Sequence, residues 1–156
     1  MNKPIKRVTE LQDLSRDHHQ GLLLCWKIRT GIKRGIENNR IMQYVQWFWL
    51  NHLEEHFEIE ETMVFPVLGE ENEMVKQALS EHGRIKSLIE GGKGDLSVRL
   101  NSIEELIEKH IRFEERQLFN EIQQVASGEE LKKIQLAHTS QEFKDNMSDP
   151  FWVSAK

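Results

Sequence analysis

The sequence predicts an all-α fold, an up-down-up-down antiparallel four-helix bundle followed by a short C-terminal fifth helix. Apolar residues recur at helical spacing along nearly the whole chain, and no stretch alternates in the way that a strand does. Glycine and proline fall mainly between these segments, where they would end helices. Four long helices with short connections are typical of such a bundle.

The composition indicates a single domain over residues 1–156. With 38% hydrophobic residues, a chain of this length can bury a substantial core. The net charge of -5 argues against a nucleic acid or an anionic membrane as partner, and the apolar runs are too short to span a bilayer. The single cysteine, Cys25, and the absence of a signal-like N-terminal run favour a cytoplasmic protein.

Capping and breaking residues set the expected helix ends. Thr9 and Gln12 form a capping-box pattern at the start of the first helix, and Gly31 and Gly35 mark its end. Pro66 stops the second helix, because the residue before a proline avoids the α conformation. We therefore expect the first three helices at about residues 9–35, 39–65 and 72–90.

The second half of the chain carries two further helices. The glycine-rich break at 91–95 separates the third helix from a fourth at about residues 97–127, with Gly128 as its stop signal. These four helices form the bundle, at about residues 9–127. An extra helix at about 129–143 and an irregular tail complete the chain, and we expect Phe151 and Trp152 in that tail to dock on the domain.

Two helical segments repeat one skeleton. HFEIEETMVFP and HIRFEERQLF match at a constant offset, so that a histidine is followed one turn later by a glutamate and then by a phenylalanine. The matched residues are His56, Glu60 and Phe65 in the first segment, and His110, Glu114 and Phe119 in the second. An imidazole and a carboxylate therefore stand on the core-facing side of each helix.

The first and third helices add one histidine each to the same layer. His18 and His82 lie on the apolar stripes of their helices. At a rise of about 1.5 Å per residue, His18, His56 and His82 fall at nearly the same height in an antiparallel bundle. The fourth helix must extend beyond this layer by roughly two to three turns if His110 is to join them.

Buried carboxylates among imidazoles indicate a metal site. A buried, unpartnered carboxylate is costly, and a divalent metal removes that cost. Four histidines and two glutamates divide into two 2-His-1-carboxylate sets, which favour non-haem iron, and two bridging glutamates can hold metals about 3.5–4 Å apart. Structural zinc, which prefers closed sites often containing sulfur, fits poorly. The competing interpretation is that these are core histidines without a metal. The candidate ligands are His18, His56, Glu60, His82, His110 and Glu114.

Four neighbouring residues are expected to lie outside the site. Glu61 and Glu115 are turned by about 100° from the candidate ligands, so we expect them in solvent, with nearly silent alanine variants. His138 is expected at the surface. His52, one turn before His56, could support the site or its access but is not counted among the ligands.

This pattern resembles the hemerythrin-like HHE cation-binding domain family over about residues 8–127. The resemblance rests on an early His, then HxxxEE…FP, a single His, and HxxxEE…LF. It implies a four-helix bundle around two iron ions with an oxo or hydroxo bridge, held by the six residues named above with both glutamates bridging. His19 is the alternative to His18, because either can match the first histidine of the family.

The resemblance also implies a function. The family's oxygen carriers have HxxxH on the third helix and HxxxxD on the fourth, whereas this chain has Lys86 at the second position and HxxxE. Reversible oxygen transport is therefore not expected. The ligand set is more similar to the branch with iron-centre repair proteins and iron or oxygen sensors. The ExxH pattern of ferritin-like di-iron proteins is absent from the sequence.

Three classes of function remain open. The first is a di-iron protein that binds or reacts with O2, NO or peroxide in iron or redox homeostasis or in sensing. The second is a small di-iron enzyme that acts on NO or peroxide. The third is an interaction module with a structural metal site, in which the tail with Phe151 and Trp152 contacts a protein partner.

Overall fold

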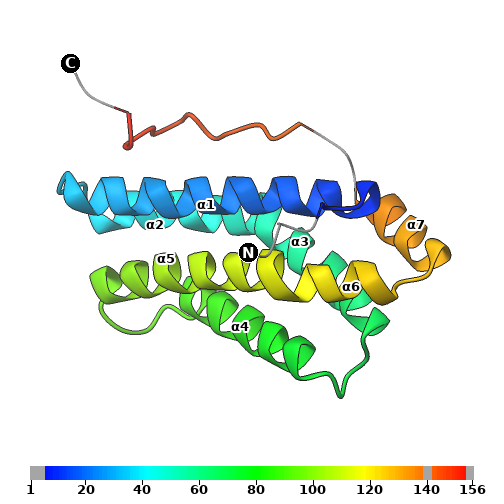
Figure 1. The fold of residues 1–156 in the computed structure, drawn as a ribbon. Coiled ribbons are helices and arrows are strands. Elements are labelled where there is room, and N and C mark those ends of the chain that lie inside the picture. The colour runs from blue at the N-terminus through cyan, green and yellow to red at the C-terminus, as the bar shows by residue number, and fades with distance from the viewer. Residues whose placement is uncertain (1–5, 139–141, 154–156) are drawn as a thin grey trace, which may run out of the picture.

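The structure is a computed structural model that describes residues 6–138 and 142–153. Within these residues the chain is all-helical and has no strand, which confirms the predicted class. The long helices lie side by side as a bundle (Figure 1). The α-helices are α1 (Gln12–Lys33), α2 (Asn38–Phe48), α3 (Glu54–Ile59), α4 (Glu73–Glu90), α5 (Leu96–Phe113), α6 (Phe119–Val125) and α7 (Gly128–Ala137).

The bundle has four long helical rods: α1, the second rod from α2 to η3, α4, and the fourth rod from α5 to α6. The second and fourth rods contain wider, π-helical turns. The second rod joins α2 and α3 through η2 (Trp49–Leu53) and continues into η3 (Glu60–Val64), both π-helical. The fourth rod joins α5 and α6 through the π-helical η5 (Glu114–Leu118). A π turn holds an additional residue and is common at functional sites. Here η3 and η5 each begin at one of the two candidate glutamate ligands.

The ends of the first two rods agree only in part with the prediction. The chain enters α1 through a 3-10 turn, η1 (Thr9–Leu11), with Val8 in the N-cap position and no capping side chain. The predicted capping box is wrong, because the Gln12 side chain donates to the Arg7 carbonyl instead. Pro66 does end the second rod, inside the 3-10 turn η4 (Phe65–Val67).

The fifth helix differs from the prediction at both ends. Ser127 caps α7 and forms a capping box with Glu130, so Gly128 opens this helix instead of closing the fourth rod. The fourth rod ends at Val125, where the next residue becomes extended. At the other end α7 stops at Ala137, because His138 is extended, and not at Phe143. Residues 139–141 lie outside the described part of the chain.

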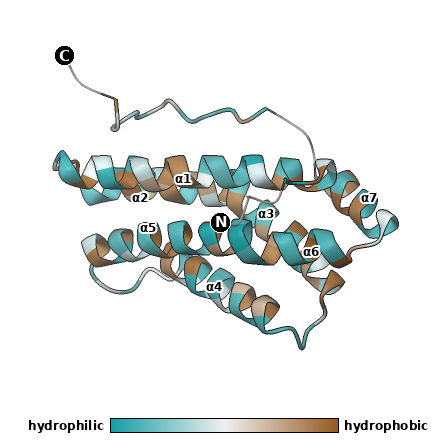
Figure 2. Cartoon of the chain, in the orientation of Figure 1, coloured by the Kyte–Doolittle hydropathy of each residue, from teal (hydrophilic) through white to brown (hydrophobic). Residues whose placement is uncertain are grey.

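The core consists of two apolar clusters with a polar layer between them. Each helix shows apolar and polar faces (Figure 2). Along α1, Leu14 belongs to one cluster and Leu24 to the other. Along the fourth rod, Ile107 and Leu118 divide in the same way. The candidate ligands of both rods stand between these residues, so apolar side chains close the layer above and below. Three large apolar residues of the helices, Trp26, Met63 and Leu79, are substantially exposed.

Residues 142–153 run along α1 and α2 (Figure 1). Phe151 and Trp152 are buried there, as expected. The ammonium group of the buried Lys27 donates to Asp145 at 2.6 Å and lies 4.4 Å from the Trp152 ring centroid. Since this chain itself covers both aromatic rings, they are not free to contact a protein partner. None of the helices in the described residues combines the length and apolar character that crossing a membrane requires.

Two helix glycines provide a test of this tail docking. A Cβ atom on Gly31 would lie 2.8 Å from the Phe151 ring and from Ile41, whereas a Cβ on Gly83 would meet open space. We expect Gly83→Ala to raise the free energy of unfolding by roughly 0.5–1 kcal/mol, because alanine favours the helix. Gly31→Ala should instead lower it by about 1–3 kcal/mol, the usual cost of overpacking. Urea unfolding measures both changes, and equal stabilisation by the two variants would contradict the described docking.

Candidate metal centre

The structure brings all six predicted ligands into one buried layer. Each has at most 4% of its surface exposed. Their donor atoms form two groups that share the two glutamates, and within each group the atoms lie within 4.8 Å of one another. One group is His18, His56, Glu60 and Glu114, and the other is His82, His110, Glu60 and Glu114. His19 is exposed, on the outer side of α1, and does not reach the layer.

The two groups are nearly equivalent in geometry. His18 Nε2 lies 2.9 Å from Glu114, and the corresponding His82 Nε2 lies 3.1 Å from Glu60. Within each rod, His56 to Glu60 and His110 to Glu114 are both 3.3 Å. The repeated skeleton seen in the sequence is therefore half of a larger repeat. The hairpin of α1 with the second rod corresponds to the hairpin of α4 with the fourth.

Each of the four imidazoles is oriented by a further carboxylate at its other ring nitrogen. Nδ1 lies 2.7 Å from Glu115 in His18, and 2.9 Å from Asp17 in His56. In the second group the distances are 2.8 Å from His82 to Glu61 and 2.7 Å from His110 to Glu81. An ionised carboxylate only accepts hydrogen bonds, so each Nδ1 carries the proton. A neutral ring then points the lone pair of Nε2 into the layer.

This arrangement leaves an excess of acceptors at the centre. The Nε2 atoms of His18 and His56 are 3.2 Å apart, and those of His82 and His110 are 3.1 Å apart. Two lone pairs at this distance repel each other unless a cation lies between them. Both oxygens of Glu60 and one oxygen of Glu114 are buried without a hydrogen-bond partner. Neutral imidazole and carboxylate are ligands for divalent transition metals, so the donor set fits a metal ion.

The pKa values of the metal-free layer show the same demand for positive charge. Burial and the neighbouring Glu114 raise the pKa of Glu60 well above its usual range. Burial alone would lower the pKa of His110, but the Glu114 carboxylate and the hydrogen bond to Glu81 raise it to about 10. The pKa of His18 is raised in the same way by its bonds to Glu114 and Glu115. Protons therefore supply the missing charge when no metal does.

Aromatic rings cover the imidazoles and restrict their movement. Phe57 stacks face to face on His82, with 3.7 Å between ring centroids, and Phe119 stacks on His18 at 5.1 Å. Phe65, the counterpart of Phe119, lies 5.4 Å from His82. Rings fixed on one side by stacking and at Nδ1 by a carboxylate keep their Nε2 atoms directed at the centre. Such outer contacts orient metal ligands and tune their basicity.

Glu61 and Glu115 belong to neither group of converging donor atoms, but each holds the Nδ1 of a candidate ligand. The Glu61 side chain is 43% exposed, which agrees with the expected solvated position, whereas the Glu115 side chain is partly buried at 31%. The signal that could have revealed them is adjacency. Each of these four outer carboxylates is next in sequence to a ligand, and a residue turned by about 100° on a helix faces the neighbouring helix. The four are Asp17, Glu61, Glu81 and Glu115.

The remaining predicted neighbours are distributed around the layer. His138 is only partly exposed, because its Nε2 lies 2.7 Å from Asp17, which also holds His56. His52 stands outside the layer among aromatic side chains, 4.5 Å from the Phe143 ring. Lys86 is exposed and does not contribute to the layer. The third rod therefore supplies one imidazole, His82.

Comparison with known families agrees with this geometry. The model of the hemerythrin HHE cation-binding domain matches residues 9–122, which include all six candidate ligands. The chain belongs to this family. Among curated proteins and among solved structures, no match to the chain was found. Membership of a cation-binding family and the buried clusters of histidine and glutamate together make this a hemerythrin-like metal-binding domain.

The outer carboxylates generate a prediction about metal affinity. Glu115→Ala removes the acceptor that fixes the tautomer and orientation of His18. We expect this variant to bind metal about 10- to 100-fold more weakly, the usual loss when such a partner is removed. Glu58→Ala, at an exposed position on α3, is the matched control and should leave affinity unchanged. Competition with a chelator of known affinity measures both variants. An unchanged metal affinity in Glu115→Ala would contradict the role of Glu115 in orienting His18.

The raised histidine pKa values predict the pH dependence of the metal-free protein. The pKa of His110 is about 10 in the folded protein against 6.5 in the unfolded chain. The stabilisation of the folded protein by protonated His110 is complete below pH 6.5 and disappears as the pH rises towards 10. The melting temperature of chelator-treated protein should therefore fall over this window. Metal-loaded protein should show a smaller fall, because the ion replaces the protons. A melting temperature that rises in chelator-treated protein over the same window would contradict the assignment.

Proposed function

We propose that this domain holds two iron ions between His18, His56, Glu60, His82, His110 and Glu114, and that it binds or reacts with O2, NO or peroxide in iron or redox homeostasis or in sensing. One observation carries the proposal. Four Nε2 atoms converge with the oxygens of two shared, buried glutamates, and three of those four oxygens have no hydrogen-bond partner. The fourfold repetition of Nδ1 to carboxylate contacts supports it, because each contact directs the Nε2 atom of its imidazole at the centre.

The donor set favours two irons over one ion of another kind. Among the residues that the structure describes, no sulfur lies in the layer, since the buried Cys25 bonds the Glu104 carbonyl instead, so closed zinc sites with thiolate are disfavoured. Each group supplies two imidazoles and a share of two carboxylates, which suits non-haem Fe(II) with open positions. Two such ions would supply the redox chemistry towards O2, NO or peroxide.

The surroundings of this layer favour small, uncharged reactants. Apolar clusters above and below the layer limit the access of water. Burial raises the pKa of the Cys25 thiol to about 12, so this thiol is not a competing redox group. The proposal also includes an up-down-up-down order of the four long helices and a cytoplasmic location of the protein. Lys86, exposed in place of a second histidine on the third rod, supports oxidation over reversible oxygen carriage.

Metal content and reactivity test the proposal together. Protein produced in iron-containing medium should contain two irons per chain and absorb in the near-ultraviolet charge-transfer region. The reduced protein, mixed with air-saturated buffer in a stopped-flow instrument, should be oxidised without a long-lived oxygenated species. Stoichiometric zinc without iron uptake would overturn the assignment of iron. An oxygenated spectrum that reverses under vacuum would instead indicate an oxygen carrier.

Ligand variants separate the metal layer from the rest of the fold. Glu60→Ala and Glu114→Ala should each lose at least one of the two metals, because each glutamate belongs to both groups. His18→Ala should lose metal, whereas the exposed His19→Ala should retain it. Elemental analysis of the purified variants, with circular dichroism to verify folding, measures this. Retention of both metals by the folded Glu60 variant would refute the shared-ligand assignment.

A further inference from the structure

A cavity of about 490 Å³ opens from the surface to the metal layer. It reaches three of the six candidate ligands, His18, His56 and His110. A diatomic molecule needs only a small part of this space. The volume falls instead in the range of about 300–1,000 Å³ that is usual for sites that bind small organic molecules. Such sites are mostly apolar, and this inner wall is too: it includes Phe48, Leu53, Ile85, Ile107 and Ile111.

Beside the cavity, the two halves of the internal repeat carry different side chains. On the His82 side, Phe57 covers the imidazole at 3.7 Å between ring centroids. The equivalent residue of the other hairpin is Ile111, which cannot cover His18 in this way. Gly21 in α1 stands at the position that Ile85 has in α4, and the Ile111 side chain packs against it. His18 therefore lines the cavity, whereas His82, covered by Phe57, does not.

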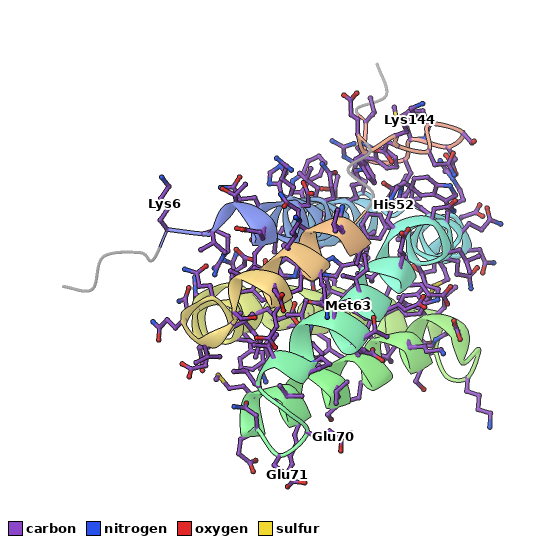
Figure 3. The ribbon with its side chains drawn as sticks, turned by 90° about the vertical axis from the view of Figure 1, so that its right-hand side faces the viewer. Lys6, His52, Met63, Glu70, Glu71 and Lys144 are labelled. Atoms are coloured by element: carbon purple, nitrogen blue, oxygen red, sulfur yellow. The ribbon has the colours of Figure 1, made fainter. Side chains whose placement is uncertain are left out.

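Aromatic rings surround the outer part of the cavity. His52 lies 5.5 Å from Phe48 and 4.5 Å from Phe143, measured between ring centroids, and all three line the space. His52 and Lys144 stand on the same side of the molecule (Figure 3). Burial lowers the pKa of His52, so its ring is uncharged at neutral pH. Rings of this kind favour a flat, aromatic ligand through offset or edge-to-face contacts.

The charges at the rim discriminate between ligands. Three carboxylates, Asp17, Glu55 and Glu142, line the cavity against one ammonium group, Lys144. A ligand with a carboxylate therefore meets like charge, whereas an uncharged or cationic ligand does not.

We propose that this cavity binds a small aromatic molecule, uncharged or positively charged, beside the metal centre. Its aromatic body would lie among Phe48, Leu53 and Ile111, and its polar end would face the acidic rim. The proposal rests on the proposed function in one respect, the presence of a metal at the inner end of the ligand. The cavity itself is built by side chains of this chain.

Three probes with one aromatic body and different charges test the proposal. Indole, tryptamine and indole-3-acetate are titrated into the metal-loaded protein by calorimetry. We expect indole and tryptamine to bind at one site per chain, and indole-3-acetate to bind at least about tenfold more weakly because the rim repels its charge. Equal or tighter binding of indole-3-acetate would overturn the charge preference. Failure of all three probes to bind would overturn the site.

Matched tryptophan variants locate the binding. Leu53→Trp places a large ring in the cavity, whereas Leu50→Trp adds the same ring to an exposed position of η2. The first variant should weaken tryptamine binding at least about tenfold by occupying its space, and the second should leave it unchanged. Ile111→Phe, which restores the residue of the other hairpin, provides a second filled cavity if Leu53→Trp does not fold. Unaltered binding in a folded, filled variant would refute the proposal.

Metal content measured on the same samples separates this proposal from the proposed function. Tryptamine binding by a protein that takes up no iron would refute the di-iron assignment and leave the aromatic site standing. Two irons without any binding of the probes would refute the aromatic site alone. Circular dichroism of each variant verifies that loss of binding does not reflect loss of the fold.

Discussion

The structure depends on the burial of two carboxylates, Glu60 and Glu114, at the centre of a helical domain. Neither is exposed to solvent, and their uncompensated charge would oppose folding. Four imidazoles lie in the same layer, and four further carboxylates hold those imidazoles at their Nδ1 atoms. The apolar clusters on both sides lower the local dielectric constant, which strengthens the electrostatic contacts inside the layer. Stability and cation binding are consequently linked in this domain.

Much of the fold could be predicted from the sequence because long amphipathic helices have a strong periodic signal. Pro66 and the glycine-rich break at 91–95 ended helices where expected. The local ends were less predictable. Gly128 fits a helix stop as well as a start, and only the capping box of Ser127 with Glu130 decides between them. The π-helical turns have no periodic signature, since they shift the helix by one residue within an otherwise regular stripe.

The inner layer of the candidate site was more accessible to sequence reasoning than its surroundings. Spacing on one helix places His56 beside Glu60, and the repeat directs attention to His110 and Glu114. The contacts of Glu61, Glu81, Glu115 and Asp17 run between helices, so they depend on how each rod is rotated against its neighbour. Helical facing alone assigned two of these residues to solvent. The cavity was also beyond prediction, because it depends on how side chains such as Ile111 and Phe57 pack within the folded core.

The crossed support of the imidazoles has a consequence for how the domain assembles. The first hairpin contains His18 and His56, but the carboxylate that orients His18 comes from Glu115 of the second hairpin. The second hairpin in turn relies on Glu61 of the first to orient His82. A separated hairpin thus carries imidazoles without a complete set of orienting partners. A competent metal layer is therefore a property of the closed bundle, in which the two hairpins are docked.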